Sequence, residues 1–348
     1  MHPSKLSALF VFGFLASLTS AQTPPAQKPS FEDVTSFSKH ASEVTALAFD
    51  ERGAQIVSAS ADGVRRWTAR DGQETGGAEA RSDGAVAVRA DRTGGAWLAA
   101  AERRPSRIVL HDLVKREERL RFNPHDVAHE TSPRRGGFSA AVRQVAFSSD
   151  GKRLLTAGTS WLVGGGHGYH GGEVKLWDVE SGKLVRRFGA VREAEYRYHE
   201  GGVEKVVPQG AVIRDGLSTS TTIRSLACNA ELVAVGTHGA GGELPESGEV
   251  RIWNATTGDL VRTIVMKKVV PQGGWSPSVK AVALSADGRH VATATAGRRY
   301  GTDEGRRADV RLWDIESGRE VLALRGHETA VVAMTFSPDG RLLAAAGH

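Results

Sequence analysis

The chain has 348 residues, 40% of them hydrophobic and 24% charged, which excludes a disordered chain and fits a soluble, turn-rich globular protein. The net charge of +5 comes from 45 Lys+Arg against 40 Asp+Glu, scattered in short pairs, so a nucleic-acid partner is not expected. A single cysteine, Cys228, excludes an intramolecular disulfide and a thiolate zinc site, and its apolar surroundings predict a buried core residue.

The N-terminus has the three-part pattern of a secretory signal. Lys5 is followed by the apolar run Leu6–Leu18 and then by the small residues Thr19-Ser20-Ala21. The run is shorter than the roughly 20 residues that span a bilayer. We therefore expect residues 1–21 to be a signal peptide cleaved after Ala21. The mature protein would be periplasmic or secreted, with no membrane insertion after cleavage, and residues 22–38 would begin as a Pro-rich linker.

From residue 44 onward one pattern of alternating apolar residues recurs. Each unit has a first apolar stretch, a turn such as SSDGK (148–152), a second stretch, and a third stretch such as VKLWD (174–178). Strict alternation between Gly-Asp turns predicts short antiparallel strands, four per unit. The first stretches are VTALAF (44–49), AVAV (85–88), VRQVAF (142–147), IRSLAC (223–228), VKAVAL (279–284) and VVAMTF (331–336).

This plan resembles the WD40 repeat family, with Trp-Asp at 177–178 and 313–314 and Gly-His at 326–327. The resemblance covers residues 39–348 and implies an all-β fold, a β-propeller of four-stranded antiparallel blades. Five blades are recognisable and a sixth is incomplete, because its third strand is missing. We expect a C-terminally incomplete sequence whose full form has six or seven blades; the alternative is an open propeller that a partner completes. Phe31–Ser38 is the candidate ring-closing strand.

The resemblance also implies a hydrogen-bond network within blades, running from His through Ser/Thr and Asp to Trp. The first blade would supply it from His40, Ser58, Asp62 and Trp67. The matching residues of other blades are Trp177, Asp178, Trp253, Trp313, Asp314 and His327. The second blade has His111 in place of Trp, so we expect some blades to depend on apolar packing alone.

Six insertions interrupt the repeat, and we expect all of them on one face of the disc, as a binding face. They hold six aromatic residues that are candidate anchors for a protein or peptide partner. Packing of the long loops onto the disc is the other interpretation of these residues. The aromatic residues are Trp161, Tyr169, Tyr196, Tyr198, Trp275 and Tyr300. The insertions are 123–141, 159–172, 189–222, 237–248, 266–278 and 296–307.

Four loop histidines, His125, His129, His167 and His170, are weak metal candidates, and histidines without a metal are the favoured interpretation. We expect no cofactor and no catalytic residue, since no G-x-S-x-G elbow occurs. The segment 164–172 is Gly-rich and predicts a mobile loop. The hexapeptide KVVPQG occurs twice, at 205–210 and 268–273, and predicts a loop with a Pro-Gln-Gly turn.

The sequence favours an exported, bacterial-type propeller that binds a protein partner and performs no chemistry. Two alternatives stay open: a propeller enzyme or metal-binding protein with its site at the channel mouth, and a module of a larger exported protein that continues past residue 348. Neither the identity of the partner nor the oligomeric state follows from the sequence.

Overall fold

The structure is a computed structural model, and it describes the chain in segments. These are residues 9–14, 31–37, 39–78, 85–90, 95–103, 106–124, 141–164, 167–188, 190–200, 203–214, 222–238, 248–266, 278–296, 309–324 and 330–347. Every regular element within these segments is a β-strand. Accordingly, these segments hold no helix with the length and apolarity that a membrane crossing needs.

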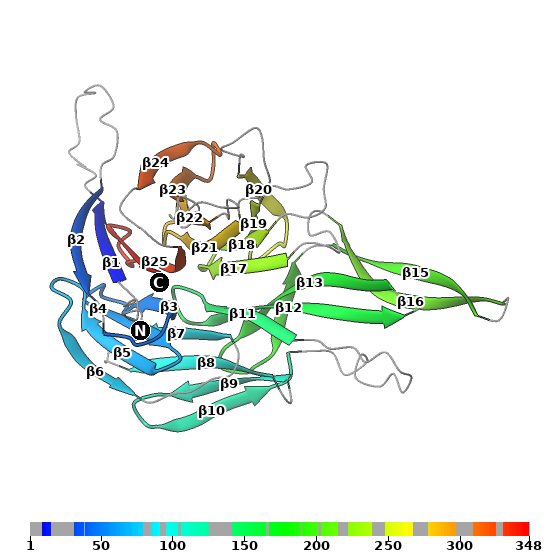
Figure 1. Cartoon of the computed structure of the whole chain (residues 1–348), viewed down its shortest axis with the longest axis horizontal. Helices are drawn as coiled ribbons and strands as arrows, with labels where there is room; N and C mark the ends of the chain where they lie inside the picture. Colours follow the sequence, from blue (N-terminus) through cyan, green and yellow to red (C-terminus); the bar gives the residue numbers. More distant parts are fainter. Residues whose placement is uncertain are drawn as a thin grey trace, which may run out of the picture.

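Five blades follow one another along the chain, each built from four consecutive antiparallel strands (Figure 1). The first two comprise β3 (Val44–Phe49), β4 (Gln55–Ser60), β5 (Gly63–Thr68) and β6 (Glu74–Ala78), then β7 (Val86–Ala90), β8 (Ala96–Arg103), β9 (Ser106–Asp112) and β10 (Glu117–Phe122). The third comprises β11 (Ala141–Phe147), β12 (Arg153–Gly164), β13 (His167–Asp178) and β14 (Leu184–Phe188).

The fourth and fifth blades are linked into one sheet by a single pair, His238↔Ser278. The fourth comprises β17 (Thr222–Cys228), β18 (Leu232–His238), β19 (Glu249–Asn254) and β20 (Leu260–Val265). The fifth comprises β21 (Ser278–Leu284), β22 (His290–Ala296), β23 (Asp309–Asp314) and β24 (Glu320–Leu324). The expected all-β propeller with five recognisable blades is thus confirmed.

A sixth sheet completes the ring from both ends of the chain. Its order is β2 (Phe31–Phe37), β1 (Leu9–Phe14), β26 (Leu342–Gly347) and β25 (Val331–Phe336). The candidate ring-closing strand is therefore the outermost strand, and it pairs with β1 rather than directly with the C-terminal strands. The sequence left the third-strand place of this blade empty; in the structure β1 takes that place and pairs with β26 along five residues.

The core lies between neighbouring blades, because each sheet buries both of its faces. The first strands contact one another in sequence around the ring, from β3 through β7, β11, β17, β21 and β25 back to β3. Ala344 and Ala346 of β26 pack with Ile56 and Trp67 of the first blade, which closes the ring through described side chains. Alternate residues of β26, Leu343 and Ala345 among them, face the fifth blade instead. This two-sided burial explains why the strands are rich in Val, Leu and Ala.

Two of the insertions are hairpins rather than loops. β12 and β13 continue their pairing through Thr159↔Gly172 and Trp161↔His170 out to Gly164↔His167. The prediction of a mobile loop over 164–172 was therefore wrong for its described residues. β15 (Ala190–Glu200) and β16 (Val203–Arg214) form a separate hairpin, and both hairpins reach outward on the same side of the ring in Figure 1.

The first KVVPQG copy lies inside β16, where Pro208 pairs with Glu195 and Gln209 with Ala194. The predicted Pro-Gln-Gly turn at this copy was wrong. Pairing with β15 gives the backbone partners along the segment, and local turn signals yield to it. The second copy, at 268–273, lies outside the described residues.

Each Ser-x-Asp-Gly turn is held by its own side chains. In the fifth blade the Ser285 hydroxyl donates to Asp287 at 2.6 Å, and the N–H of His290 donates to Ser285 Oγ at 2.9 Å. Gly288 follows with a φ of 69°, which an L side chain rarely adopts. The same arrangement recurs at Ser148 and Ser337, so these turns fix the register between the first and second strands.

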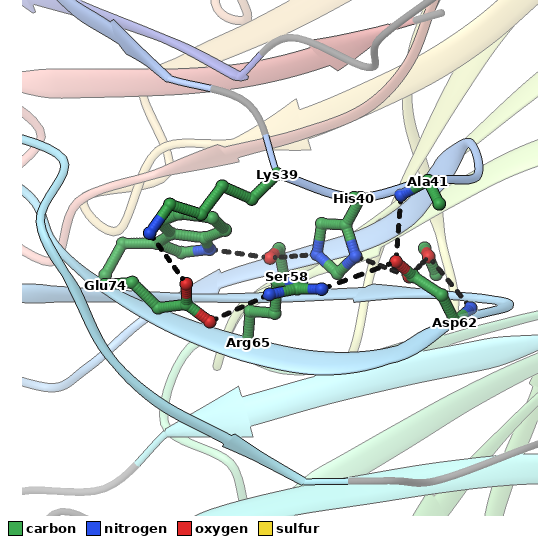
Figure 2. A network of polar contacts seen from close by, with 9 residues as sticks. Lys39, His40, Ala41, Ser58, Asp62, Arg65 and Glu74 are labelled. Carbon is green, nitrogen blue, oxygen red and sulfur yellow. Dashed lines mark hydrogen bonds and ion pairs between the residues drawn. The ribbon is translucent and has the colours of Figure 1, made fainter. Parts of the chain in front are cut away.

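A network of hydrogen bonds links His40 to residues of the first blade (Figure 2). The Trp67 indole N–H donates to Ser58 Oγ at 2.7 Å, and Ser58 Oγ lies 2.7 Å from His40 Nε2. His40 Nδ1 lies 2.6 Å from Asp62 Oδ1, and the Ala41 N–H donates to Asp62 Oδ2 at 2.9 Å. Every contact is satisfied if Ser58 donates to Nε2 and His40 donates from Nδ1 to the carboxylate. The network therefore anchors the segment that leads into β3.

Other blades keep parts of this network. Trp177 donates to Thr156 Oγ1 and Trp313 to Thr293 Oγ1, each at 2.9 Å. In the fourth blade Val235 lies where those blades have Thr, and Trp253 packs in an apolar cluster with Phe188. Asp178, Asn254 and Asp314 instead accept backbone N–H groups in the turn after the third strand. His327 lies outside the described residues.

We predict that Ser58→Ala destabilises the protein more than Thr156→Val. The first change removes the hydrogen-bond partner of two buried groups, the Trp67 indole N–H and His40 Nε2, whereas the second removes only that of the Trp177 indole N–H. Each orphaned buried group costs about 1–3 kcal/mol, so we expect roughly 2–4 kcal/mol for Ser58→Ala and half of that for Thr156→Val. Urea unfolding followed by tryptophan fluorescence measures both. Equal losses in the two variants would show that His40 contributes nothing.

We also predict an acid-sensitive stability that depends partly on Asp62. Burial opposes ionisation of Asp62, but hydrogen bonds from Ser60, Ala41 and His40 outweigh it and lower its pKa. A carboxylate with a lowered folded-state pKa stabilises the fold fully above the unfolded value, about 3.9, and loses this contribution as the pH falls below it. Melting temperatures should therefore change little between pH 7 and 5 and fall below pH 4, less steeply in Asp62→Asn. A parallel fall in variant and wild type would contradict this role.

Candidate functional site

A channel runs through the centre of the ring, lined by the first strands of all six sheets. Its cavity has a volume of about 160 Å³, and its walls carry small and apolar side chains such as Ala46, Val145 and Ala281, with Gln144 and Thr45 among the polar ones. A space of this size and composition fits a side chain or a few waters rather than a drug-sized molecule. The channel itself therefore has room for a single side chain and little more.

Most of the first strands carry a β-bulge near their N-terminal ends. The pairing register shifts between Val142 and Gln144, between Ile223 and Ser225, and between Val279 and Ala281, and equivalent shifts occur in β3 and β25. A bulge adds one residue to the strand and re-aims its side chain. The added residues are Thr45, Arg143, Arg224, Lys280 and Val332.

Three of these bulge residues are basic and belong to three consecutive blades, the third, fourth and fifth. We call Arg143, Arg224 and Lys280 the basic arc. The residue before each of them is buried, whereas Arg143 and Arg224 are exposed and Lys280 is half-buried. The bulge thus turns each cation outward at the same end of the strands. Sequence reasoning did not single out these residues, although each of three successive first stretches has Lys or Arg as its second residue.

Two cations of the arc, Arg224 and Lys280, lie within each other's electrostatic reach. Burial lowers the pKa of Lys280, the positive charge of Arg224 lowers it further, and Glu43 opposes the shift. The ion pairs between described residues include none of the three arc residues. Like charges that lack an ion-paired carboxylate favour an anion that lies over them.

Arginines of the third strands are neutralised by neighbouring acids instead. Arg65 pairs with Glu74 at 2.9 Å, and Arg311 contacts Asp309 at 2.7 Å and Glu320 at 2.6 Å. These pairs lie on the outer parts of the blades, where they cover the sheet surface. The difference marks the channel mouth as the place where positive charge is left available.

The predicted partner-binding residues fall into two groups. Trp161, Tyr169, Tyr196 and Tyr198 belong to the two long hairpins, where their strand positions are described. Trp275 and Tyr300 lie outside the described residues. In the backbone register, Tyr196 pairs with Val207 and Tyr198 with Lys205.

The described part of the chain does not assemble the candidate metal-ligating histidines into a site. His167 and His170 are strand residues of β13, paired with Gly164 and Trp161, and His125 and His129 lie outside the description. The described residues contain no group of three or more potential ligands, and Cys228, which burial keeps protonated by raising its pKa, is a core residue.

Comparison with known proteins agrees with this architecture. The WD domain, G-beta repeat family matches residues 31–64, 134–178 and 318–348. Coronin-7 of Rattus norvegicus is 28% identical over 101 residues, and Coronin-7 of Mus musculus is 29% identical over 101 residues; each match covers 28% of this chain and 10% of the relative. Centriole proteome protein 16 of Chlamydomonas reinhardtii is 32% identical over 130 residues, which covers 28% of this chain and 6% of that protein.

The chain therefore spans a small fraction of the length of these curated relatives, 10% of each Coronin-7. What it shares with them is a stretch of repeats rather than a whole protein. The matched segments begin at β2 and end within the sixth sheet, so they belong to the ring itself. Together with the ring of four-stranded sheets, they show that the chain is a β-propeller that carries WD40 repeats in three segments.

Proposed function

We propose that the protein is an exported, non-catalytic scaffold that binds a protein partner through the face at the mouth of its central channel. The observation that carries this proposal is the basic arc. Its three cations have no ion-pair partner among the described residues of three consecutive blades, and the residues that follow them, Gln144, Ser225 and Ala281, line the channel. Such a combination suits an acidic segment of a partner, whose charges meet the arc while a side chain enters the channel.

The position of the insertions supports the same face. Segments 123–141, 189–222 and 266–278 lead directly into β11, β17 and β21, the strands that carry the arc residues near their N-terminal ends. Long connections beside a charged mouth are where a propeller gains contact area and specificity. The aromatic residues of these segments, Tyr196 and Tyr198 among them, are the proposed anchors, since Tyr dominates interface energetics.

Export is proposed from the N-terminal pattern alone. The sequence combines Lys5, the apolar run Leu6–Leu18 and the small residues before Gln22, as a cleavable leader does. Freedom from disulfides is compatible with this destination, because the single buried cysteine cannot mispair within the chain.

We predict that reversing the arc, with Arg143→Glu, Arg224→Glu and Lys280→Glu together, removes partner binding. The matched control reverses Lys152, Arg289 and Arg341, which are exposed and follow the turns at the other end of the strands. Wild type and both variants are used as baits in a periplasmic extract, and captured proteins are quantified by mass spectrometry. We expect at least a tenfold loss of the specific partners with the arc variant alone.

Two other results would count against the proposal. Equal capture by all three baits would remove the arc from the interface, and capture by none would remove the scaffold function. The intact mass of the exported bait tests the leader separately, because cleavage after Ala21 leaves a chain that begins at Gln22.

A further inference from the structure

The sixth sheet is built from two separate parts of the chain, and its third strand is the apolar run at the N-terminus. β1 pairs with β26 on one side, from Leu9↔Ala346 to Gly13↔Leu342, and with β2 on the other. In Figure 1 β1 and β2 lie beside β25, at the edge of the ring where the first and last residues of the fold meet. The apolar run of the predicted leader is thus also a strand of the propeller.

The register of β1 matches the third strands of the other blades. In the fifth blade Val310 pairs with Ala294, Leu312 with Ala292 and Trp313 with Val291. The residues of β26 in those places are Ala346, Ala344 and Leu343, as their pairing with β25 shows. Opposite them lie Leu9, Val11 and Phe12. The run L-F-V-F therefore stands where the blades have V-R-L-W, with Phe12 at the place of the tryptophan.

The outer pairing carries the same irregularity. Wherever a third strand contains the tryptophan, its register against the fourth strand shifts just before that residue, as between Leu312 and Trp313. In the sixth sheet the register shifts between Val11 and Phe12. Two independent features, the inner register and the outer bulge, thus assign β1 to the third-strand place.

β26 needs a strand in the third-strand place to pair with its backbone. Leu343, Ala344, Ala345 and Ala346 are fully buried, and the backbone of β26 pairs with β25 on its other side. Withdrawal of β1 leaves a row of unpaired N–H and C=O groups along β26 and separates β2 from the sheet. An exposed edge between two strands of a built sheet accepts an added strand.

We propose that the space between β26 and β2 is a strand-acceptor site, held by Leu9–Phe14 in the precursor and open to a peptide in the processed protein. This proposal rests on one part of the proposed function, namely that cleavage of the leader during export removes β1. The ligand is an extended peptide with the pattern apolar-x-apolar-aromatic, which runs antiparallel to β26. Main-chain hydrogen bonds bind the peptide, and the alternating apolar residues set its register.

The first arm of the test asks whether β1 occupies the site. Val11 and Ala344 are opposite residues, whose Cα atoms lie about 4.5–5.5 Å apart in an antiparallel pair, within reach of a disulfide. In the full chain we expect Val11→Cys with Ala344→Cys to cross-link readily under mild oxidation. The control, Val11→Cys with Ala345→Cys, moves the partner to the opposite face of β26 and should not cross-link. Equal cross-linking of both pairs, or of neither, overturns the assignment.

The second arm asks whether the site accepts a peptide. A fluorescent peptide with the sequence of residues 309–314, DVRLWD, is titrated against the chain that begins at Gln22 and against the cross-linked full chain. We expect saturable anisotropy changes with the processed chain and at least a tenfold weaker response with the locked one. The peptide DVLRWD has the same composition but turns the arginine inward, and it should not bind.

Failure of the processed chain to fold still leaves the test decisive. A full chain with a protease site between residues 22 and 30 is folded first and then cut, and DVRLWD should displace the released N-terminal fragment on size exclusion. No binding and no displacement in folded protein overturns the proposal, as does equal binding to the locked chain. A leader that is retained on export would contradict the proposed cleavage while leaving both arms of this test unchanged.

Discussion

The whole structure depends on one packing requirement: each sheet must bury both faces against its neighbours. A blade with apolar residues on both sides has no stable place at an open end, so the ring closes or one face remains in water. In this chain the closing contact is made by Ala344 and Ala346 against Ile56 and Trp67. The small side chains of β26 allow this close approach, and the network at Trp67 holds the first blade in the orientation that receives it.

The same requirement explains what sequence reasoning could predict. Burial on both faces, repeated at a fixed interval, produced six alternating stretches such as VKAVAL, and these located the inner strands. The resemblance to the WD40 family led to His40, Ser58, Asp62 and Trp67 as one network. Local patterns sufficed in both cases, because the interactions involved lie within a blade or recur in each one.

Other parts followed from contacts that local patterns do not encode. The glycines over 164–172 and the Pro-Gln-Gly of 208–210 predicted loops. Strand pairing nevertheless supplies backbone partners along their described residues. The run Leu9–Phe14 is apolar without alternation, and such a run fits a leader and a buried strand equally well. The strand pairing of this run becomes evident only from its register against β26. The basic arc was missed because each cation looks like an ordinary surface charge until the bulges place three of them at one mouth.

The two proposed sites place different demands on the protein. The arc uses the end of a completed ring, and its cations keep their spacing only while β11, β17 and β21 stay in contact. The acceptor site lies in the sixth sheet, which contacts the fifth blade on one side and the first on the other. A strand that enters beside β26 would therefore stiffen the neighbours of β21, which carries Lys280. If the two sites are coupled through this shared packing, linkage requires that each ligand change the affinity of the other by the same factor.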